Sequence, residues 1–256
     1  TALASIEDAT ATKPYVIKIA PGTYTENSNV AMKNYVDVEG SGQDVTTIKC
    51  ACSNVSPDAS SAVISAGAIN AEIRHLTINN TSGGGSFGNG LFTESVTDGS
   101  FSMLHVTATA TGGSDHNSGV LNYSSSSPTM NNVTAIAEAA DGKRNYGVYN
   151  ISSSPTMNNV TATATGTSYS YGVYNTGSSP TMNNVTATAT GGTGSYGVYN
   201  EDSTVKIRNS SLTGTFSIQT DGQQTAYLAH TTLDGTVGPV TECFGVYNAS
   251  FVEINC

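Results

Sequence analysis

The closest grouping of acid, imidazole and cation side chains in this chain precedes two copies of a repeated segment. When the copies are aligned, Asp115 lies over Lys143 and His116 lies over Arg144, with Asp141 close by. A carboxylate, an imidazole and two cations together can bind an acidic sugar or support acid–base chemistry. The alternative is a surface ion pair of little energetic weight.

Three aspartates are the weak candidates for catalytic acids: Asp98, Asp115 and Asp141. A glycoside hydrolase needs two carboxyl groups roughly 5–9.5 Å apart on either side of the scissile bond. These residues therefore leave open a polysaccharide lyase or a glycoside hydrolase. Two of the three acids in one groove would favour that alternative.

A tyrosine occupies the outward position in each Gly-Val-Tyr-Asn segment. Successive residues of a strand point to opposite faces, so Tyr149 points outward if Val148 points inward. The equivalent tyrosines are Tyr174, Tyr199 and Tyr247. Outward rings at regular spacing can stack against sugar rings and offer hydroxyls for hydrogen bonds. The alternative is that stacked tyrosines only stabilise the sheet.

These candidates belong to a sequence that is written three times. The phrase Ser-Pro-Thr-Met-Asn-Asn-Val occupies residues 127–133, 154–160 and 179–185. The segment Tyr-Gly-Val-Tyr-Asn begins at Tyr146 and recurs twice at intervals of 25 residues. A fixed period in this range is typical of a solenoid, in which each repeat stacks on its neighbours.

The residues of one repeat alternate with the period of a strand. From Val160 to Thr165, Val and Ala alternate strictly with Thr, which predicts an apolar inner face and a threonine outer face. Several short strands in a 25-residue repeat predict an all-β protein: a right-handed parallel β-helix of about ten rungs. Leu3, Ile6 and Ala9 have helical spacing and predict a short N-terminal capping helix.

We expect a single domain over residues 1–256. The expected divisions are an N-terminal cap at 1–12, first rungs at 13–50, regular repeats at 71–240 and a C-terminal rung or cap at 241–256.

Two polar columns follow from aligning the repeats. The first takes the second Asn of each Met-Asn-Asn and its equivalents. Its members are His75, His105, Asn132, Asn159, Asn184, Asn209, His230 and Asn255. The second ends the Gly-Val-Tyr-Asn strands, at Asn122, Asn150, Asn175, Asn200 and Asn248. Stacked amides bond from rung to rung, so we expect structural ladders that hold bends and take no part in catalysis. On this alignment the apparent glycosylation sequons fall on an inner ladder.

Composition restricts the partners. The 256 residues carry a net charge of −10, with 11% charged residues, which argues against nucleic acid as a partner. No segment approaches the roughly 20 apolar residues of a membrane helix, so we expect no membrane insertion. The four cysteines favour an extracellular protein with disulfides, Cys243–Cys256 and Cys50–Cys52, although buried free thiols are the alternative. Their spacing does not suit zinc, and we expect no metal and no cofactor.

Two stretches carry a resemblance to known families. Residues 14–26 contain Pro-Gly-Thr-Tyr-Thr-Glu, and residues 36–42 read Val-Asp-Val-Glu-Gly-Ser-Gly. These first rungs resemble pectinesterase-like proteins, and the repeats resemble bacterial secreted parallel β-helix proteins of the pectin-lyase-like superfamily. The resemblance implies a right-handed parallel β-helix. The catalytic blocks typical of pectinesterases have no counterpart here, and the chain has no tryptophan.

The combined interpretation is a non-catalytic module, secreted or displayed on a microbial surface, that is structural or binds a polysaccharide. A third hypothesis comes from the outward threonines, whose regular spacing is typical of ice-binding solenoids. These threonines are Thr107, Thr109, Thr111, Thr161, Thr163, Thr165, Thr186, Thr188 and Thr190; the intervening rung has Thr134, Ile136 and Glu138 instead. Oligomeric state is not predicted.

Overall fold

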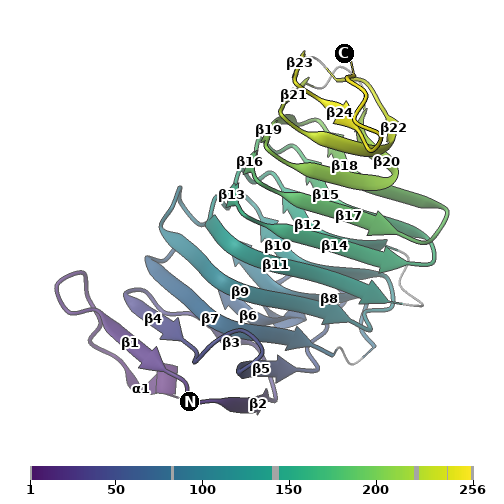
Figure 1. Ribbon diagram of the computed structural model, residues 1–256. Coiled ribbons are helices and arrows are strands. Elements are labelled where there is room, and N and C mark those ends of the chain that lie inside the picture. The colour runs from purple at the N-terminus through teal and green to yellow at the C-terminus, as the bar shows by residue number, and fades with distance from the viewer. Residues whose placement is uncertain (1, 82–83, 140–143, 222–224, 241, 255–256) are drawn as a thin grey trace.

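The chain winds into a parallel β-solenoid of about eight turns (Figure 1). The computed structural model describes residues 2–81, 84–139, 144–221, 225–240 and 242–254. All pairings between the strands it describes are parallel. The two termini lie at opposite ends of the coil, and successive turns stack in sequence order. The described strands form about eight turns, fewer than the ten or so rungs expected from the sequence.

Three walls enclose the core. The first wall is built from β1 (Tyr15–Lys18), β4 (Val36–Glu39), the first parts of β7 (Ala71–Asn80), β9 (Phe101–Thr111) and β11 (Thr129–Ala139), then β13 (Thr156–Asn158), β16 (Thr181–Asn183), β19 (Thr204–Arg208), β21 (Thr225–Ala229) and β23 (Glu242–Phe244). The threonine wall is built from β2 (Gly22–Glu26), β5 (Thr46–Cys50), the second parts of β7, β9 and β11, then β14 (Thr161–Gly166), β17 (Thr186–Thr190), the first part of β20 (Ser211–Asp221), β22 (Thr232–Val237) and β24 (Tyr247–Asn248). The tyrosine wall is built from β3 (Val30–Ala31), β6 (Ala62–Ala66), β8 (Phe87–Glu94), β10 (His116–Tyr123), β12 (Arg144–Ile151), β15 (Tyr169–Thr176), β18 (Gly194–Glu201) and the second part of β20.

Apolar side chains stack in columns along the axis. One column of the first wall is buried and continuous over seven turns: Ile73, Met103, Met130, Met157, Met182, Ile207 and Leu228. The expected alternation therefore holds, because the register pairs equivalent positions of successive repeats. Burying such side chains supplies most of the folding free energy.

The tyrosine and threonine walls approach each other closely at a column of glycines. A Cβ at Gly147 would lie 2.6 Å from the amide nitrogen of Thr163, and a Cβ at Gly172 would lie 2.8 Å from that of Thr188. Small alanines such as Ala162 and Ala187 line the opposite side and are fully buried. This region of the core is therefore thin, and it has no room for a larger side chain.

The N-terminal cap is shorter than its spacing predicts. The helix α1 covers only Ala2–Ser5, a single turn, with Leu3 packed into the core. Asp8 accepts hydrogen bonds from Lys13 and from Tyr15, whose Oη lies 2.8 Å away. These contacts hold the chain in a turn instead of a second helical turn. Ile6 and Ala9 still pack against the core, in a non-helical segment. No helix among the described residues is long and apolar enough to cross a membrane.

Candidate functional site

Two columns of tyrosines cover the outer side of the tyrosine wall. We call the set Tyr146, Tyr149, Tyr171, Tyr174, Tyr196 and Tyr199 the tyrosine face. The register pairs equivalent members directly, from β12 through β15 to β18, and continues to Phe216 and Gln219 on β20. Both columns point outward because the strand bends between them: Gly147 and Val148, which separate Tyr146 from Tyr149, both face the interior.

The rings of the tyrosine face pack against one another. Tyr146, Tyr171 and Tyr196 stack with centroids 5.2 Å apart and planes within 11°. Tyr174 and Tyr199 stack at 5.1 Å with an interplanar angle of 2°. The two columns meet edge to face at the Tyr171–Tyr174 pair, at 77°. In the turn before, Tyr149 stacks on Tyr146 at 4.3 Å and 14° and stands edge-on to Tyr174 at 84°. Stacked neighbours occupy the ring faces, so what the column turns to solvent is ring edges and hydroxyls. Stacking of a sugar on these faces, as the sequence suggested, is not the contact this geometry favours.

Burial divides the tyrosine face into supporting and accessible rings. Tyr146 is 1% exposed and Tyr171 is 8% exposed, although both lie on the outer side of the sheet. Tyr149, Tyr174 and Tyr199 are half-buried. Tyr196 is half-buried as well. The accessible part of the face is therefore the Tyr149 column together with Tyr196, and Tyr146 and Tyr171 form its base.

Charged groups border the rings. Tyr174 Oη donates a hydrogen bond to Glu201 Oε2 at 2.6 Å. Arg144 lies beside Tyr146, and the neighbouring tyrosines raise the pKa of the Arg144 guanidinium. A carboxylate and a guanidinium at opposite margins can orient a polar ligand through charge-assisted hydrogen bonds.

The tyrosines of the face should resist ionisation at alkaline pH. Burial raises the pKa of Tyr149 to about 12, and burial together with the Glu201 carboxylate raises the pKa of Tyr174 still further. An unfolded tyrosine has a pKa of about 10. Because the folded pKa is raised, the stabilising contribution is complete below pH ~10 and is lost as the pH rises from ~10 through ~12. We expect a tyrosinate absorbance titration to show a late group of tyrosines that joins the early group on denaturation. Ionisation of all tyrosines near pH 10 in the folded protein would contradict this.

The predicted charged corner is present only in part within the described residues. His116 pairs with Arg144 in the register of β10 and β12, and the Arg144 amide donates to the Asp115 carbonyl oxygen at 2.9 Å. The His116 ring stacks on Phe87 at 4.5 Å, and its Nδ1 lies 3.6 Å from Asp115 Oδ2. His116 thus extends the aromatic column. Asp141 and Lys143 lie outside the described residues.

The two described candidates for catalytic acids, Asp98 and Asp115, lie in different turns. Asp98 lies in the exposed turn before β9, and Asp115 lies in the turn after it. The 11 residues of β9 separate the two turns. Among the described residues, no group of three or more His, Cys, Asp or Glu side chains is placed to hold a metal ion.

The first polar column holds a bend and lies on the outside. Its described members have positive φ angles near 50°, for example 51° at His105 and 54° at Asn184. Asn and His tolerate this left-handed conformation better than most residues do. Asn184 Nδ2 donates to Asn159 Oδ1 at 2.6 Å, and His75 stacks on His105 at 5.2 Å. In this column Asn132 is half-buried, and the exposed members are Asn159, Asn184, Asn209 and His230. The prediction that the glycosylation sequons lie on an inner ladder is therefore wrong. The bend directs these side chains outward, whereas strict alternation along a strand would direct them inward.

The last described turn departs from the aligned columns. After His230 the position with positive φ belongs to Gly245, at 58°; Asn255 lies outside the described residues. Tyr247 pairs with Thr232 on the threonine wall, and Gln219 occupies the position after Tyr199. The last Gly-Val-Tyr-Asn segment thus adopts a different place in the turn, and Tyr247 is not part of the tyrosine face.

The second asparagine column is a buried ladder. Asn122, Asn150, Asn175 and Asn200 are fully buried, and the Nδ2 of each of the first three donates to the next Oδ1 at 2.8 Å. Thr93 Oγ1 continues the ladder at the N-terminal side by donating to Asn122 Oδ1 at 2.7 Å. Asn248 is half-buried in the last turn and lies outside this ladder.

The outward threonines form a regular patch over two turns. Thr161, Thr163 and Thr165 pair directly with the equivalent threonines of β17, and Thr165 Oγ1 lies 3.1 Å from Thr190 Oγ1. On the N-terminal side, Ile136 and Glu138 interrupt the columns. The uninterrupted patch is therefore small, and ice binding stays an untested hypothesis.

The cysteines lie at opposite ends of the coil. Cys50 and Cys52 are joined by a disulfide at the end of β5. Cys243 on β23 is disulfide-bonded as well; Cys256, the partner expected from the sequence, lies outside the described residues.

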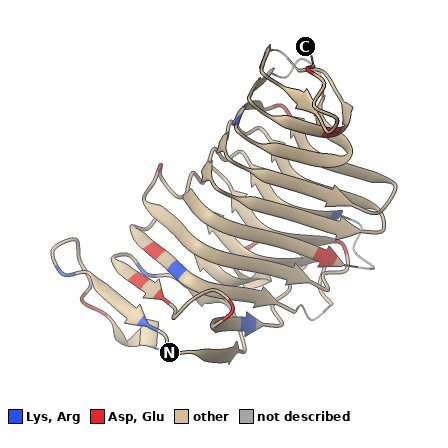
Figure 2. Ribbon diagram, viewed as in Figure 1, with Lys and Arg blue, Asp and Glu red and all other residues tan. Residues whose placement is uncertain are grey.

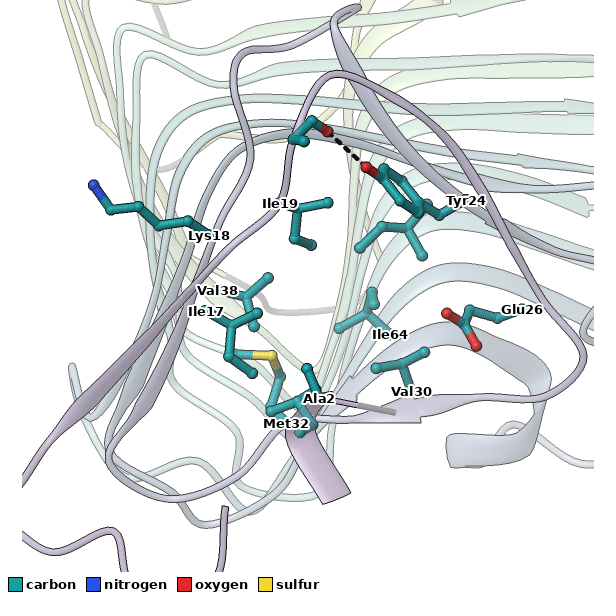
Figure 3. A pocket seen from close by; sticks show the side chains of 13 residues that line it. Ala2, Ile17, Lys18, Ile19, Tyr24, Glu26, Val30, Met32, Val38 and Ile64 are labelled. Atoms are coloured by element: carbon teal, nitrogen blue, oxygen red, sulfur yellow. Dashed lines mark hydrogen bonds between the residues drawn. The ribbon is translucent and has the colours of Figure 1, made fainter. Parts of the chain in front are cut away.

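A pocket of about 420 Å³ opens at the N-terminal end (Figure 3). Its lining is mainly apolar, with Ile17, Val38 and Ile64 among the side chains that point into it. Tyr24 Oη closes one side by donating to the Ala20 carbonyl oxygen at 3.0 Å. The pocket is the open mouth of the core where α1 covers only part of the first turn. Lys18 and Glu26 are the charged groups of its lining, and they do not form a catalytic arrangement.

A charged cluster on β4 and β7 was not predicted. Arg74 forms ion pairs with Glu72 at 2.7 Å, Glu39 at 2.8 Å and Asp37 at 3.2 Å, and these charged residues lie side by side on the first wall (Figure 2). Glu39 and Arg74 are direct partners in the register, which alternation along one strand does not reveal. The three carboxylates surround one guanidinium, so the ion pairs satisfy Arg74 and leave an excess of negative charge on the cluster.

Comparisons with known proteins define the fold. No protein-family model and no curated protein matches the chain. Among solved structures, the pectin methylesterase of Yersinia enterocolitica superposes with a TM-score of 0.55 at 15% identity, over 99% of this chain and 90% of that one. Pectin methylesterase PemA of Erwinia chrysanthemi gives 0.54 at 12% identity, over 98% and 84%. A mutant pectin methylesterase in complex with a hexasaccharide gives 0.50 at 13% identity, over 99% and 85%.

The chain therefore has the pectin-lyase-like parallel β-helix fold, which it shares with carbohydrate-active enzymes. At these identities the likeness concerns the fold alone, and function has to be argued from the surface of this chain.

Proposed function

We propose that this protein is a non-catalytic carbohydrate-binding β-helix, secreted or displayed on a cell surface, and that the tyrosine face binds the ligand. The observation that carries the proposal is the repetition of one polar-aromatic surface unit over three successive turns. Each turn presents a half-buried tyrosine, Tyr149, Tyr174 or Tyr199, and the ring orientation itself repeats between Tyr174 and Tyr199. A polymer with a repeated unit can meet such a surface several times, and each contact adds to the affinity.

The rigidity of the face supports the proposal. The accessible rings rest on the buried rings of Tyr146 and Tyr171 and on a sheet in regular register. Side chains that are already ordered lose little conformational entropy when a ligand binds. Tyrosine also combines an apolar body with a polar tip, which suits the mixed surface of a sugar.

The separation of the described acids favours binding over turnover. Asp98 and Asp115 lie at the two ends of β9 and do not flank one groove. The structural neighbour in complex with a hexasaccharide is a pectin methylesterase. For the present chain we propose that a carbohydrate binds and that no reaction follows.

The test is a binding assay on a panel of polysaccharides with a Tyr174→Ala/Tyr199→Ala double variant. The two rings stack on each other, so the double variant removes an entire accessible pair. We expect at least fivefold weaker binding, since two lost aromatic contacts of about 0.5–1.5 kcal/mol each amount to at least about 1 kcal/mol. A matched control is Thr163→Ala/Thr188→Ala, a stacked pair on the threonine wall, which should bind as the parent does. Unchanged binding by the tyrosine variant would show that the tyrosine face is not the binding site. Release of sugar products by the parent would favour an enzyme instead.

A further inference from the structure

One margin of the tyrosine face carries a column of carboxylates. The register aligns the final residues of the strands in the order Glu94, Tyr123, Ile151, Thr176, Glu201 and Asp221. Glu201 is half-buried, and Glu94 and Asp221 are exposed. Glu201 lies two positions along β18 from Tyr199, and Asp221 lies in the adjacent turn. These two carboxylates border the accessible rings at Tyr199, whereas Glu94 lies beside Phe92, before the tyrosines begin.

The carboxylates act on the tyrosine hydroxyls beside them. Glu201 accepts the hydrogen bond of Tyr174 Oη at 2.6 Å. Burial raises the pKa of Tyr199 most, and the negative charges of Asp221 and Glu201 raise it further. A ligand on the rings would thus lie within the range over which charges interact, since screening in physiological salt acts over about 8 Å.

The opposite margin offers little positive charge. Its column reads Phe87, His116, Arg144, Tyr169 and Gly194. Arg144 is the one Lys or Arg side chain in this described column, and it is already engaged with Tyr146. The other margin has three carboxylates, Glu94, Glu201 and Asp221, and the whole chain has a net charge of −10. Counted over the residues that the structure describes, the two margins therefore carry more negative than positive side chains.

We propose that the ligand of the tyrosine face is a neutral polysaccharide and that its chain runs along the solenoid axis. This inference rests on the carbohydrate-binding function proposed above. A polyuronate would bring a carboxylate on every sugar toward Glu201 and Asp221, and like charges placed together cost affinity and suppress the wrong partner. The hydroxyls of a neutral sugar can instead donate to these carboxylates in charge-assisted hydrogen bonds and accept from tyrosine hydroxyls.

The direction of the chain follows from the columns. Equivalent tyrosines and equivalent margin positions repeat along the axis, with ring centroids 5.1–5.2 Å apart. Each turn contributes one tyrosine to the accessible column, so a polymer that lies across the strands meets a single ring. A polymer that lies along the axis meets Tyr149, Tyr174 and Tyr199 in succession and reaches the acidic margin at the last of them.

The test compares the affinity for a soluble neutral β-glucan, a soluble mannan and polygalacturonate of similar length, at low and high salt. We expect at least one neutral polymer to bind at least tenfold more tightly than polygalacturonate at low salt, with a smaller difference at high salt. Tighter binding of polygalacturonate would overturn the inference and leave the binding function standing. Binding of no polymer in the assay, or in the wider panel above, would overturn the proposed function itself.

A Glu201→Gln variant tests the effect of the negative charge of Glu201, because glutamine has nearly the same shape as glutamate. It keeps an acceptor for Tyr174 and removes the negative charge. We expect neutral-polymer affinity to fall about fivefold, because a hydrogen bond to a charged group is worth about 1 kcal/mol more than a neutral one. Polygalacturonate affinity should stay equal or rise. Glu138→Gln, an exposed position on the threonine wall, is the matched control and should change neither. A fall in affinity for polygalacturonate with Glu201→Gln would contradict the proposal.

Discussion

A Gly172→Ala variant should be about 2 kcal/mol less stable than the parent protein. A Cβ at Gly172 would lie 2.6 Å from the carbonyl oxygen of Gly197 and 2.8 Å from the amide nitrogen of Thr188. Both atoms belong to backbone, one in the next turn and one in the opposite wall, so neither can move aside alone. Overpacking of this kind costs about 1–3 kcal/mol. Alanine also restricts the unfolded chain, but that gain is only about 0.4–1 kcal/mol, so the steric cost prevails.

Gly67→Ala is the matched control. A Cβ there meets nothing within 4 Å, and the φ angle is not in the left-handed region. This variant should be as stable as the parent or slightly more stable, because only the unfolded-state effect remains. Thermal and denaturant unfolding of both variants, followed by circular dichroism, measures the difference. Equal stability of the two variants would show that the walls are not in close contact at the glycine column.

Asn175→Ala should destabilise the protein by about 4 kcal/mol. Asn175 is fully buried, donates to Asn200 Oδ1 and accepts from Asn150 Nδ2, both at 2.8 Å. The substitution leaves a buried donor on one neighbour and a buried acceptor on the other. Each unsatisfied buried group costs about 1–3 kcal/mol. The loss is larger than for an ordinary hydrogen bond because no water replaces the missing amide.

Asn158→Ala provides the comparison for the ladder. Asn158 is half-buried on the outer side and donates to Asn131 Oδ1 at 3.1 Å. Water can satisfy the groups left behind, so we expect a loss of about 1 kcal/mol or less. Unfolding midpoints of the two variants give the difference directly. If both lose the same stability, burial of the second ladder does not make its hydrogen bonds more important.

Much of the fold was predictable because the repeat reports it directly. The 25-residue interval between Tyr146, Tyr171 and Tyr196 defines the turn, and the alternation of Val160–Thr165 separates inner from outer residues. The Asn150–Asn175–Asn200 ladder also follows from spacing alone, since identical residues at identical phase must stack in a parallel solenoid.

The positions where prediction failed lie at bends and at the end of the repeat array. Asn159 and Asn184 point outward because the chain turns there with positive φ, and alternation does not continue through a bend. Tyr247 has the local sequence of the tyrosine column but pairs on the threonine wall. Between Asn200 and Tyr247 the register of β20 against β22 shifts twice, and a local motif carries no record of such a shift.

The sequence by itself determined the architecture of this protein: a polar, acidic parallel solenoid whose turns place like residues on like residues. The reason is that the period and the two-residue alternation are local properties, and parallel stacking repeats them without change. Only the tertiary structure decided how the outward tyrosines are used. Their ring faces stack on one another, their hydroxyls and edges turn to solvent, and Glu201 and Asp221 border them. Ring orientation and the charge beside it depend on neighbours in adjacent turns, which a single strand does not specify.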